Sequence, residues 1–161
     1  MFKTFFVTCL GLVIPYLFQS SILALEITLP YPTGPYRVGT KQLEFRDPSR
    51  KAFRGKQEQK WMVQAFYPTD NSATGPFPYM PHTLKDGKVY STQVLALSNP
   101  SSKVSSQGPF PLLIFIPGLG GIRQDYTILC EDLASHGYVI LSLDQPYVAN
   151  YVRFCDMSVT V

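Results

Sequence analysis

The 161-residue sequence lacks the features that several function classes need. Its 14 Lys and Arg residues are nearly balanced by 11 Asp and Glu residues, and no run of like charges occurs. A formal net charge of +3 spread in this way argues against nucleic acid as a partner, because such proteins usually carry a basic stripe. No Gly-Lys-Ser or Gly-Lys-Thr is present, which excludes a phosphate-binding loop of the Walker type.

Histidine and cysteine are also scarce. The two histidines are His82 and His136, and Asp132 lies four residues before the second of them. Two ligands without a third make a poor metal site, so we expect neither a metal nor a cofactor. Export would permit a disulfide between Cys130 and Cys155, but a lone helical cysteine is more often a free buried thiol, and we expect free thiols here.

The amino end differs in character from the rest of the chain. Lys3 precedes an apolar run from Phe5 to Phe18, and small residues follow it up to Ala24. This pattern is typical of a secretory signal peptide over residues 1–24, and predicts a periplasmic or secreted protein. The alternative is an uncleaved membrane anchor, although a spanning helix needs about 20 apolar residues. Residues 25–161 are long enough for one small domain.

Two strands are expected early in this domain. Prolines enforce an extended lead-in to a strand-like stretch from Arg37 to Phe45, and the polar residues 46–59 are predicted to form a loop. The following stretch QKWMVQAFYP alternates with a period of two, which is typical of a strand. We expect these strands to pair antiparallel at the edge of a sheet. Residues 68–110 are predicted to be a long irregular loop, which either walls a substrate pocket or is a surface excursion.

A βαβ unit is predicted next, which makes the fold class α/β. The continuous apolar run PLLIFI is typical of a strand covered on both faces, and YVILSLD predicts a second buried strand. Between them, residues 125–136 predict a helix, with Gly137 as its left-handed cap and His136 suited to the helix dipole in the last turn. The helix is indicated by apolar residues at helical spacing, namely Tyr126, Leu129, Cys130 and Leu133.

The glycine turn, defined as Gly118–Gly121, follows the first strand of this unit and admits three interpretations. It partly fits a dinucleotide fingerprint, with Asp144 ending the next strand, but Arg123 occupies the third glycine position. It also fits an oxyanion hole, in which the backbone N–H of Leu119 would face the tetrahedral intermediate. In the third interpretation, the glycines only let the strand pack closely against its helix.

Several stretches occurring in one order carry a resemblance to a known family. They are LPYPTGPYRVGTKQLEFRDPSR, VQAFYP, PYMP and PLLIFIPGLGGIRQDYTILCEDLASHGYVILSLDQPY. From Leu29 to about Phe154 the chain resembles the amino-terminal half of the platelet-activating factor acetylhydrolase family, in its bacterial, secreted form. The resemblance implies an incomplete α/β-hydrolase fold holding the amino-terminal strands, the oxyanion loop and the first helix. It also implies an esterase that cleaves a short or oxidised acyl group from a phospholipid or another small ester, and allows association with a membrane surface.

The resemblance assigns residues to only one part of the site. The family's oxyanion donor maps onto the backbone N–H of Leu119, within a loop formed by Gly118, Gly120 and Gly121. Pro117 stands where the family usually has histidine, which a main-chain donor tolerates. No position in this chain matches the family's second donor, which follows the nucleophile.

The family's catalytic serine has no counterpart in this chain. A nucleophile elbow needs Gly-x-Ser-x-Gly, and no two glycines here stand four residues apart. Ser98, Ser142 and Ser158 lack such a setting. We therefore expect the serine, acid and histidine to lie beyond Val161, and we expect the chain alone to be inactive. The departure from the family pattern after Phe154 is what a partial gene product or a frameshift would produce.

Two other functions remain open from the residues. One is a non-catalytic lipid-binding or interaction module that uses the same half of the fold. The other is a different esterase, such as a peptide or dienelactone esterase, because one fold hosts many sites. Half a sheet would leave an open edge and a bare apolar face.

Overall fold

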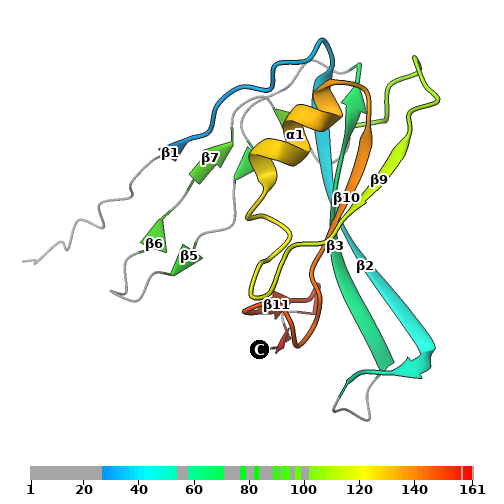
Figure 1. Ribbon diagram of the computed structural model, residues 1–161, viewed down its shortest axis with the longest axis vertical. Coiled ribbons are helices and arrows are strands. Elements are labelled where there is room, and N and C mark those ends of the chain that lie inside the picture. The colour runs from blue at the N-terminus through cyan, green and yellow to red at the C-terminus, as the bar shows by residue number, and fades with distance from the viewer. Residues whose placement is uncertain are drawn as a thin grey trace, which may run out of the picture.

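The main sheet has five strands. The computed structural model describes residues 27–53, 58–70, 102–156 and 158–160, together with short strands between residues 77 and 98. The strand order is β8 (Leu97–Ser98), β2 (Arg37–Lys51), β3 (Glu58–Thr69), β10 (Val139–Leu143) and β9 (Leu112–Phe115). β3 is antiparallel to both β2 and β10, whereas β9 and β10 are parallel (Figure 1). The predicted antiparallel pair is therefore confirmed.

Several short strands lie outside this sheet. They are β1 (Ile27–Thr28), β4 (Phe77–Pro78), β5 (His82–Thr83), β6 (Val89–Tyr90), β7 (Thr92–Val94), β11 (Val152–Arg153) and β12 (Val159–Thr160). The range 68–110, predicted to be irregular, thus contains short strands and begins inside β3. The predicted signal peptide, residues 1–24, lies outside the described residues. Among the described residues, no helix has the length and apolar character to cross a membrane.

The β2–β3 hairpin is longer than predicted. The polar residues expected to form a loop are mostly strand, because β2 continues to Lys51 and β3 begins at Glu58. Charge pairing across the hairpin accompanies this extension, with Arg46 Nη1 lying 3.1 Å from Glu58 Oε1. The pairing register shifts between Asp47 and Lys51. The expected edge position is also wrong, because β3 lies between β2 and β10, and β2 lies between β8 and β3.

The predicted βαβ unit is confirmed, since the helix α1 (Thr127–Ser135) connects β9 to the parallel strand β10. Gly137 has φ of +94°, as predicted for a left-handed cap. The helix lies across the sheet (Figure 1) and completes one hydrophobic core. The buried members of this core are Val38, Phe66, Cys130, Ala134 and Ile140.

The buried face of α1 differs from the predicted apolar stripe. Tyr126 and Leu129 are half-exposed, whereas Cys130 is fully buried. The buried helical positions are Thr127, Cys130, Glu131, Ala134 and Ser135. The carboxyl end of the helix packs closely against the backbone around Gly34. This close packing needs small side chains on the buried face, and Ala134 and Ser135 provide them.

Gly34 makes this close packing. Its N–H donates to Ser135 Oγ at 2.9 Å, and the N–H of Tyr36 donates to the Ser135 carbonyl at 3.0 Å. A Cβ on Gly34 would lie 2.2 Å from that carbonyl oxygen. The Pro-Thr-Gly-Pro-Tyr stretch therefore joins the lead-in segment to the end of α1.

Replacement of Gly34 by alanine should lower the free energy of unfolding by about 2 to 3 kcal/mol, because backbone atoms would have to separate to admit the methyl group. Urea denaturation followed by circular dichroism measures this change. Gly118→Ala is the matched control, since a Cβ there would meet nothing within 4 Å. Equal stabilities for the two variants would show that the Gly34 contact is not tight.

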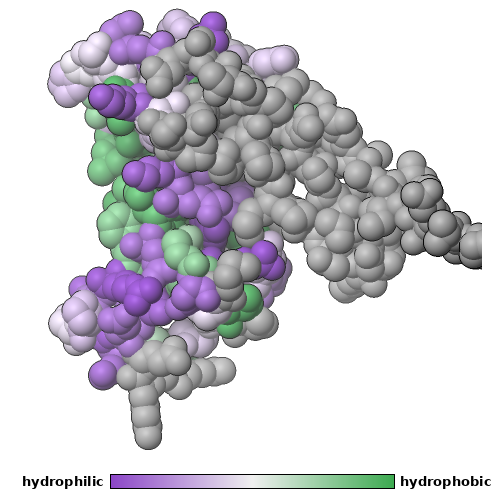
Figure 2. Space-filling view, turned by 180° about the vertical axis from the view of Figure 1, so that it is seen from behind, coloured by the Kyte–Doolittle hydropathy of each residue, from purple (hydrophilic) through white to green (hydrophobic). Residues whose placement is uncertain are grey.

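The prediction that β9 is covered on both faces is wrong for the described residues. Leu112 is 56% exposed and Ile114 is 63% exposed. Among the described strands, β9 pairs with β10 alone and forms one edge of the sheet. Figure 2 shows hydrophobic surface on this side of the molecule. The continuous apolar run is thus an uncovered edge, as expected for part of a larger sheet.

Candidate oxyanion-binding site

The glycine turn lies at the carboxyl end of β9 and leads toward α1. The chain beyond it is buried, with Ile122 at 2% exposure in a second hydrophobic cluster. The buried members of that cluster are Met62, Ile122, Ala149, Val152 and Phe154. In open α/β sheets, ligands bind outside the carboxyl ends of the strands, so the turn occupies the edge where a site is expected.

Hydrogen bonds distinguish the backbone donors of the turn. The N–H of Gly120 donates to the Val148 carbonyl at 2.9 Å, and the N–H of Gly121 donates to the Gly118 carbonyl at 2.9 Å. No described residue accepts a hydrogen bond from the N–H of Leu119. Leu119 as a whole is 93% exposed. Leu119 therefore presents an unpaired backbone donor beside two donors that are already used.

Gly120 fixes the shape of the turn. Its φ of +81° lies in the left-handed region, which L side chains rarely adopt. Its carbonyl accepts from the N–H of Asn150 at 3.1 Å, and a Cβ on Gly120 would lie 3.1 Å from Asn150 Oδ1. The glycine is thus required both by backbone conformation and by the neighbouring segment.

An open hollow lies over the turn. It is lined by Gly118, Leu119, Gly120, Gly121, Asp125, Tyr126 and Asn150. The adjoining groove shares Asp125 and Tyr126 and is lined further by Pro30, Tyr31, Pro32, Thr33, Ile128, Leu129 and Asp132. The backbone donor of Leu119 therefore lies beside a surface with both polar and apolar groups. Asn150 was not identified from the sequence, because nothing in its local pattern marks it.

Asp144 is not placed to bind a ribose, which contradicts the dinucleotide interpretation. Its side chain is fully buried and pairs with the guanidinium of Arg123, the residue in the third glycine position. Burial raises the pKa of Asp144, and the nearby Arg123 opposes that rise. The acid that ends the second strand therefore has a partner inside the protein.

The other sequence candidates do not form a catalytic or metal site in the described part of the chain. Asp132 accepts two hydrogen bonds of 2.8 Å from Thr33, and its Oδ2 lies 3.8 Å from His136 Nδ1. No group of three potential metal ligands occurs among the described residues. Ser135 Oγ lies 3.4 Å from His136 Nδ1, but this buried hydroxyl donates to the Asp132 carbonyl.

Two of the three serines considered above, Ser142 and Ser158, lack a nucleophilic setting. Ser142 is buried and donates to the Arg123 carbonyl at 3.0 Å, and Ser158 donates to Asp156. Ser98 belongs to β8 and His82 to β5.

Both described cysteines are free thiols. Cys130 is buried and Cys155 is exposed. Burial raises the pKa of the Cys130 thiol to about 12, so this group stays protonated and is a poor nucleophile at neutral pH.

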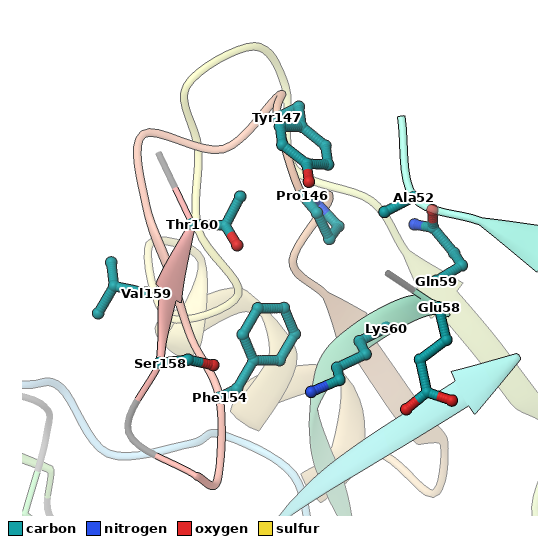
Figure 3. A pocket seen from close by; sticks show the side chains of 10 residues that line it. All are labelled: Ala52, Glu58, Gln59, Lys60, Pro146, Tyr147, Phe154, Ser158, Val159 and Thr160. Atoms are coloured by element: carbon teal, nitrogen blue, oxygen red, sulfur yellow. The ribbon is translucent and has the colours of Figure 1, made fainter. Parts of the chain in front are cut away.

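A second hollow, of about 160 Å³, lies between the β2–β3 hairpin and the last described residues (Figure 3). The ammonium group of Lys60 lies 3.2 Å from Asp156 Oδ2 and 5.6 Å from the ring centroid of Phe154. This cation is therefore already paired. The hollow shares no lining residue with the glycine turn, which remains the candidate site.

Comparison with known proteins gives two similar curated relatives. A probable 1-alkyl-2-acetylglycerophosphocholine esterase of Arthroderma benhamiae is 26% identical, over 80% of this chain and 39% of the relative. A platelet-activating factor acetylhydrolase of Canis lupus familiaris is 27% identical, over 72% of this chain and 28% of the relative. The chain thus spans less than two fifths of the length of either protein.

A solved structure shows the fold. Ferulic acid esterase from Streptomyces cinnamoneus matches with a TM-score of 0.72 and 27% identity, over 83% of this chain and 40% of that one. The described strands and helix are thus part of an α/β-hydrolase fold. The family model of platelet-activating factor acetylhydrolase, isoform II, matches residues 22–146, which include the glycine turn, α1 and β10. The chain belongs to this family.

Proposed function

We propose that this chain supplies the oxyanion-binding part of a serine esterase. The observation that carries the proposal is the N–H of Leu119, which has no acceptor among the described residues and is held in a glycine turn at the carboxyl end of β9. When a serine attacks an acyl carbonyl, negative charge develops on the carbonyl oxygen. A preorganised N–H that donates to this oxygen stabilises the transition state by about 3 to 4 kcal/mol.

The remaining catalytic groups must come from sequence outside the described residues. Among the serines whose side chains the structure describes, none combines an accessible hydroxyl with a histidine base. The exposed edge of β9 supports this view, since further parallel strands of the fold can pair there, and the helices that connect such strands can cover Leu112 and Ile114. In the proposed enzyme, a serine on such a strand would attack the ester above the glycine turn, activated by a histidine.

The proposed substrate is a phospholipid that carries a short or oxidised acyl ester. Support comes from the names of the two relatives, which concern platelet-activating factor and 1-alkyl-2-acetylglycerophosphocholine. The groove beside the turn adds support, because Tyr31, Ile128 and Leu129 are partly exposed there and offer apolar contacts for a lipid. The measurement is kcat/KM for such a phospholipid and for p-nitrophenyl acetate. A higher value for the phospholipid would favour this proposal over a general esterase.

A chimera tests the role of Leu119. Residues 27–146 of this chain would replace the equivalent part of the Streptomyces ferulic acid esterase, which keeps the rest of its own chain. Leu119→Pro removes the backbone N–H, whereas Leu119→Ala removes only the exposed side chain and retains the donor. We expect kcat for p-nitrophenyl acetate to fall by about 10²- to 10³-fold in the proline variant.

The alanine variant is the matched control and should keep kcat within about threefold of the unmodified chimera, because the donor is main chain. The KM should change little in either variant, since the bond strengthens as the oxyanion forms. Equal activity of the proline and alanine variants, with both folded by circular dichroism, would exclude Leu119 as the oxyanion donor.

A further inference from the structure

Arg123 is held by the end of β10 through its backbone as well as its side chain. Its N–H donates to Asp144 Oδ1 at 2.5 Å, and its guanidinium pairs with the other carboxylate oxygen. Its carbonyl accepts from Ser142 Oγ at 3.0 Å. Asp144 is itself attached to the sheet, because its N–H donates to the Met62 carbonyl at 2.8 Å. Both main-chain polar groups of Arg123 are thus held at the end of β10. Asp144 binds the N–H, and Ser142 binds the carbonyl.

These contacts occur where charge is costly. Arg123 is 2% exposed, and Asp144 and Ser142 are both fully buried. Apolar residues can often replace a buried ion pair without loss of stability. A contribution to stability therefore explains the presence of this pair poorly. The two hydrogen bonds to the Arg123 backbone have a different effect, since they fix the path of the chain just after the glycine turn.

The turn has a second attachment on its other side. Gly120 exchanges hydrogen bonds with Val148 and Asn150, and Gly121 closes the turn onto the Gly118 carbonyl. Only Ile122 separates Gly121 from Arg123. The position of Leu119 is therefore determined between the 148–150 segment and the Arg123–Asp144 pair.

We propose that Arg123 and Asp144 are positioning residues that hold the glycine turn so that the N–H of Leu119 faces the hollow. Neither residue touches the hollow, so they act through the backbone of the turn. The catalytic meaning of this arrangement rests on the proposed function. The positioning itself can be tested without any catalysis.

The test is amide hydrogen exchange on the 161-residue chain and on the double variant Arg123→Met/Asp144→Leu. The apolar pair removes both charges together, so the core stays neutral while the Arg123 N–H loses its acceptor. We expect the amides of Gly120 and Gly121 to exchange at least about tenfold faster in the double variant. The amide of Cys130, which donates within the first turn of α1, is the internal reference and should keep its protection.

A purely structural role predicts a different pattern, in which all three amides change together or none changes, and either result overturns the proposal. Ser142→Ala is a milder second variant that deletes only the bond to the Arg123 carbonyl. It should accelerate exchange at Gly121 by about two- to fivefold, and unchanged exchange there would also count against positioning, even if the double variant does not fold. The exchange measurements use the 161-residue chain and need no catalytic activity. If the chimera showed that Leu119 is not the oxyanion donor, the exchange results would still test the positioning, so the failure of one proposal can be told from the failure of the other.

Discussion

Removing one member of the Arg123–Asp144 pair should lower the free energy of unfolding by about 3 to 5 kcal/mol. Arg123→Met leaves the buried carboxylate of Asp144 without its partner. Asp144→Leu leaves the guanidinium of Arg123, whose side chain is 3% exposed, without its partner. Each single change therefore leaves an unpaired charge buried in the folded state, which destabilises that state. Urea denaturation of the two single variants measures this loss.

The double variant completes a thermodynamic cycle. With both charges absent, the free energy of unfolding should lie only about 1 to 3 kcal/mol below the original value, because no buried charge is left unpaired and only the buried Arg123 N–H lacks its acceptor. If the losses of the two single variants simply added in the double variant, the two residues would not be coupled. Arg46→Met is a control, since the Arg46 side chain is 49% exposed where it pairs with Glu44 and Glu58, and its loss should have a small effect.

The sequence predicted the local parts of the fold because their signals are local. The period of two in β3, the apolar run of β9 and the Gly137 cap each reflect neighbouring residues, and the structure has each element. The apolar run also indicated that β9 is built to be covered on both faces. It carried no information on which residues cover it, and the described residues leave this strand exposed.

The buried face of α1 could not be found from hydrophobicity alone. The apolar stripe places Leu129 on the core side, yet Ala134 and Ser135 are buried there, and Gly34 approaches Ser135 closely. That contact joins residues about a hundred positions apart in the sequence, and no periodicity records it.

The candidate site was predictable only in part, for a similar reason. Leu119 was found because a glycine turn after a strand is a local signal with a known chemistry. Arg123 and Asp144 are 21 residues apart, and neither residue alone indicated the other as its partner. Asp144 at a strand end would bind ribose in the dinucleotide interpretation, one of three that the sequence left open, and only its burial beside Arg123 shows the actual partner.

Glu131 should make the protein less stable as the pH rises. Its side chain is fully buried in the described structure, and neither carboxylate oxygen has a hydrogen-bond partner among the described residues. Burial raises the pKa of this carboxyl from an ordinary value of 4.5 to about 9. Between these two values the unfolded chain releases the proton and the folded chain keeps it.

This difference sets the direction and range of the pH effect. Below pH 4.5 the carboxyl is protonated in both states, so Glu131 contributes no pH dependence. From there to about pH 9 the free energy of unfolding should fall by about 1.4 kcal/mol per pH unit, because the unfolded state binds fewer protons. By pH 7.5, the accumulated loss from this one group is about 4 kcal/mol.

Glu131→Gln should abolish this slope, because the amide has a similar shape and stays neutral at every pH. The variant should match the unmodified chain near pH 4 and exceed it by about 4 kcal/mol at pH 7.5, as measured by urea denaturation across the pH range. Asp132→Asn is the matched control on the same helix. Hydrogen bonds from Thr33 lower the pKa of Asp132, so its contribution is present above its ordinary pKa of 3.8 and is lost on acidification.

The two variants should therefore differ in opposite directions from the unmodified chain at neutral pH. Glu131→Gln gains stability because the folded state no longer has to keep a proton that the unfolded chain would release. Asp132→Asn loses stability because Thr33 no longer bonds to a charged acceptor. Parallel pH profiles for Glu131→Gln and the unmodified chain would mean that the Glu131 carboxyl ionises normally in the folded state. Its burial would then have to be relieved by solvent or by a partner outside the described residues.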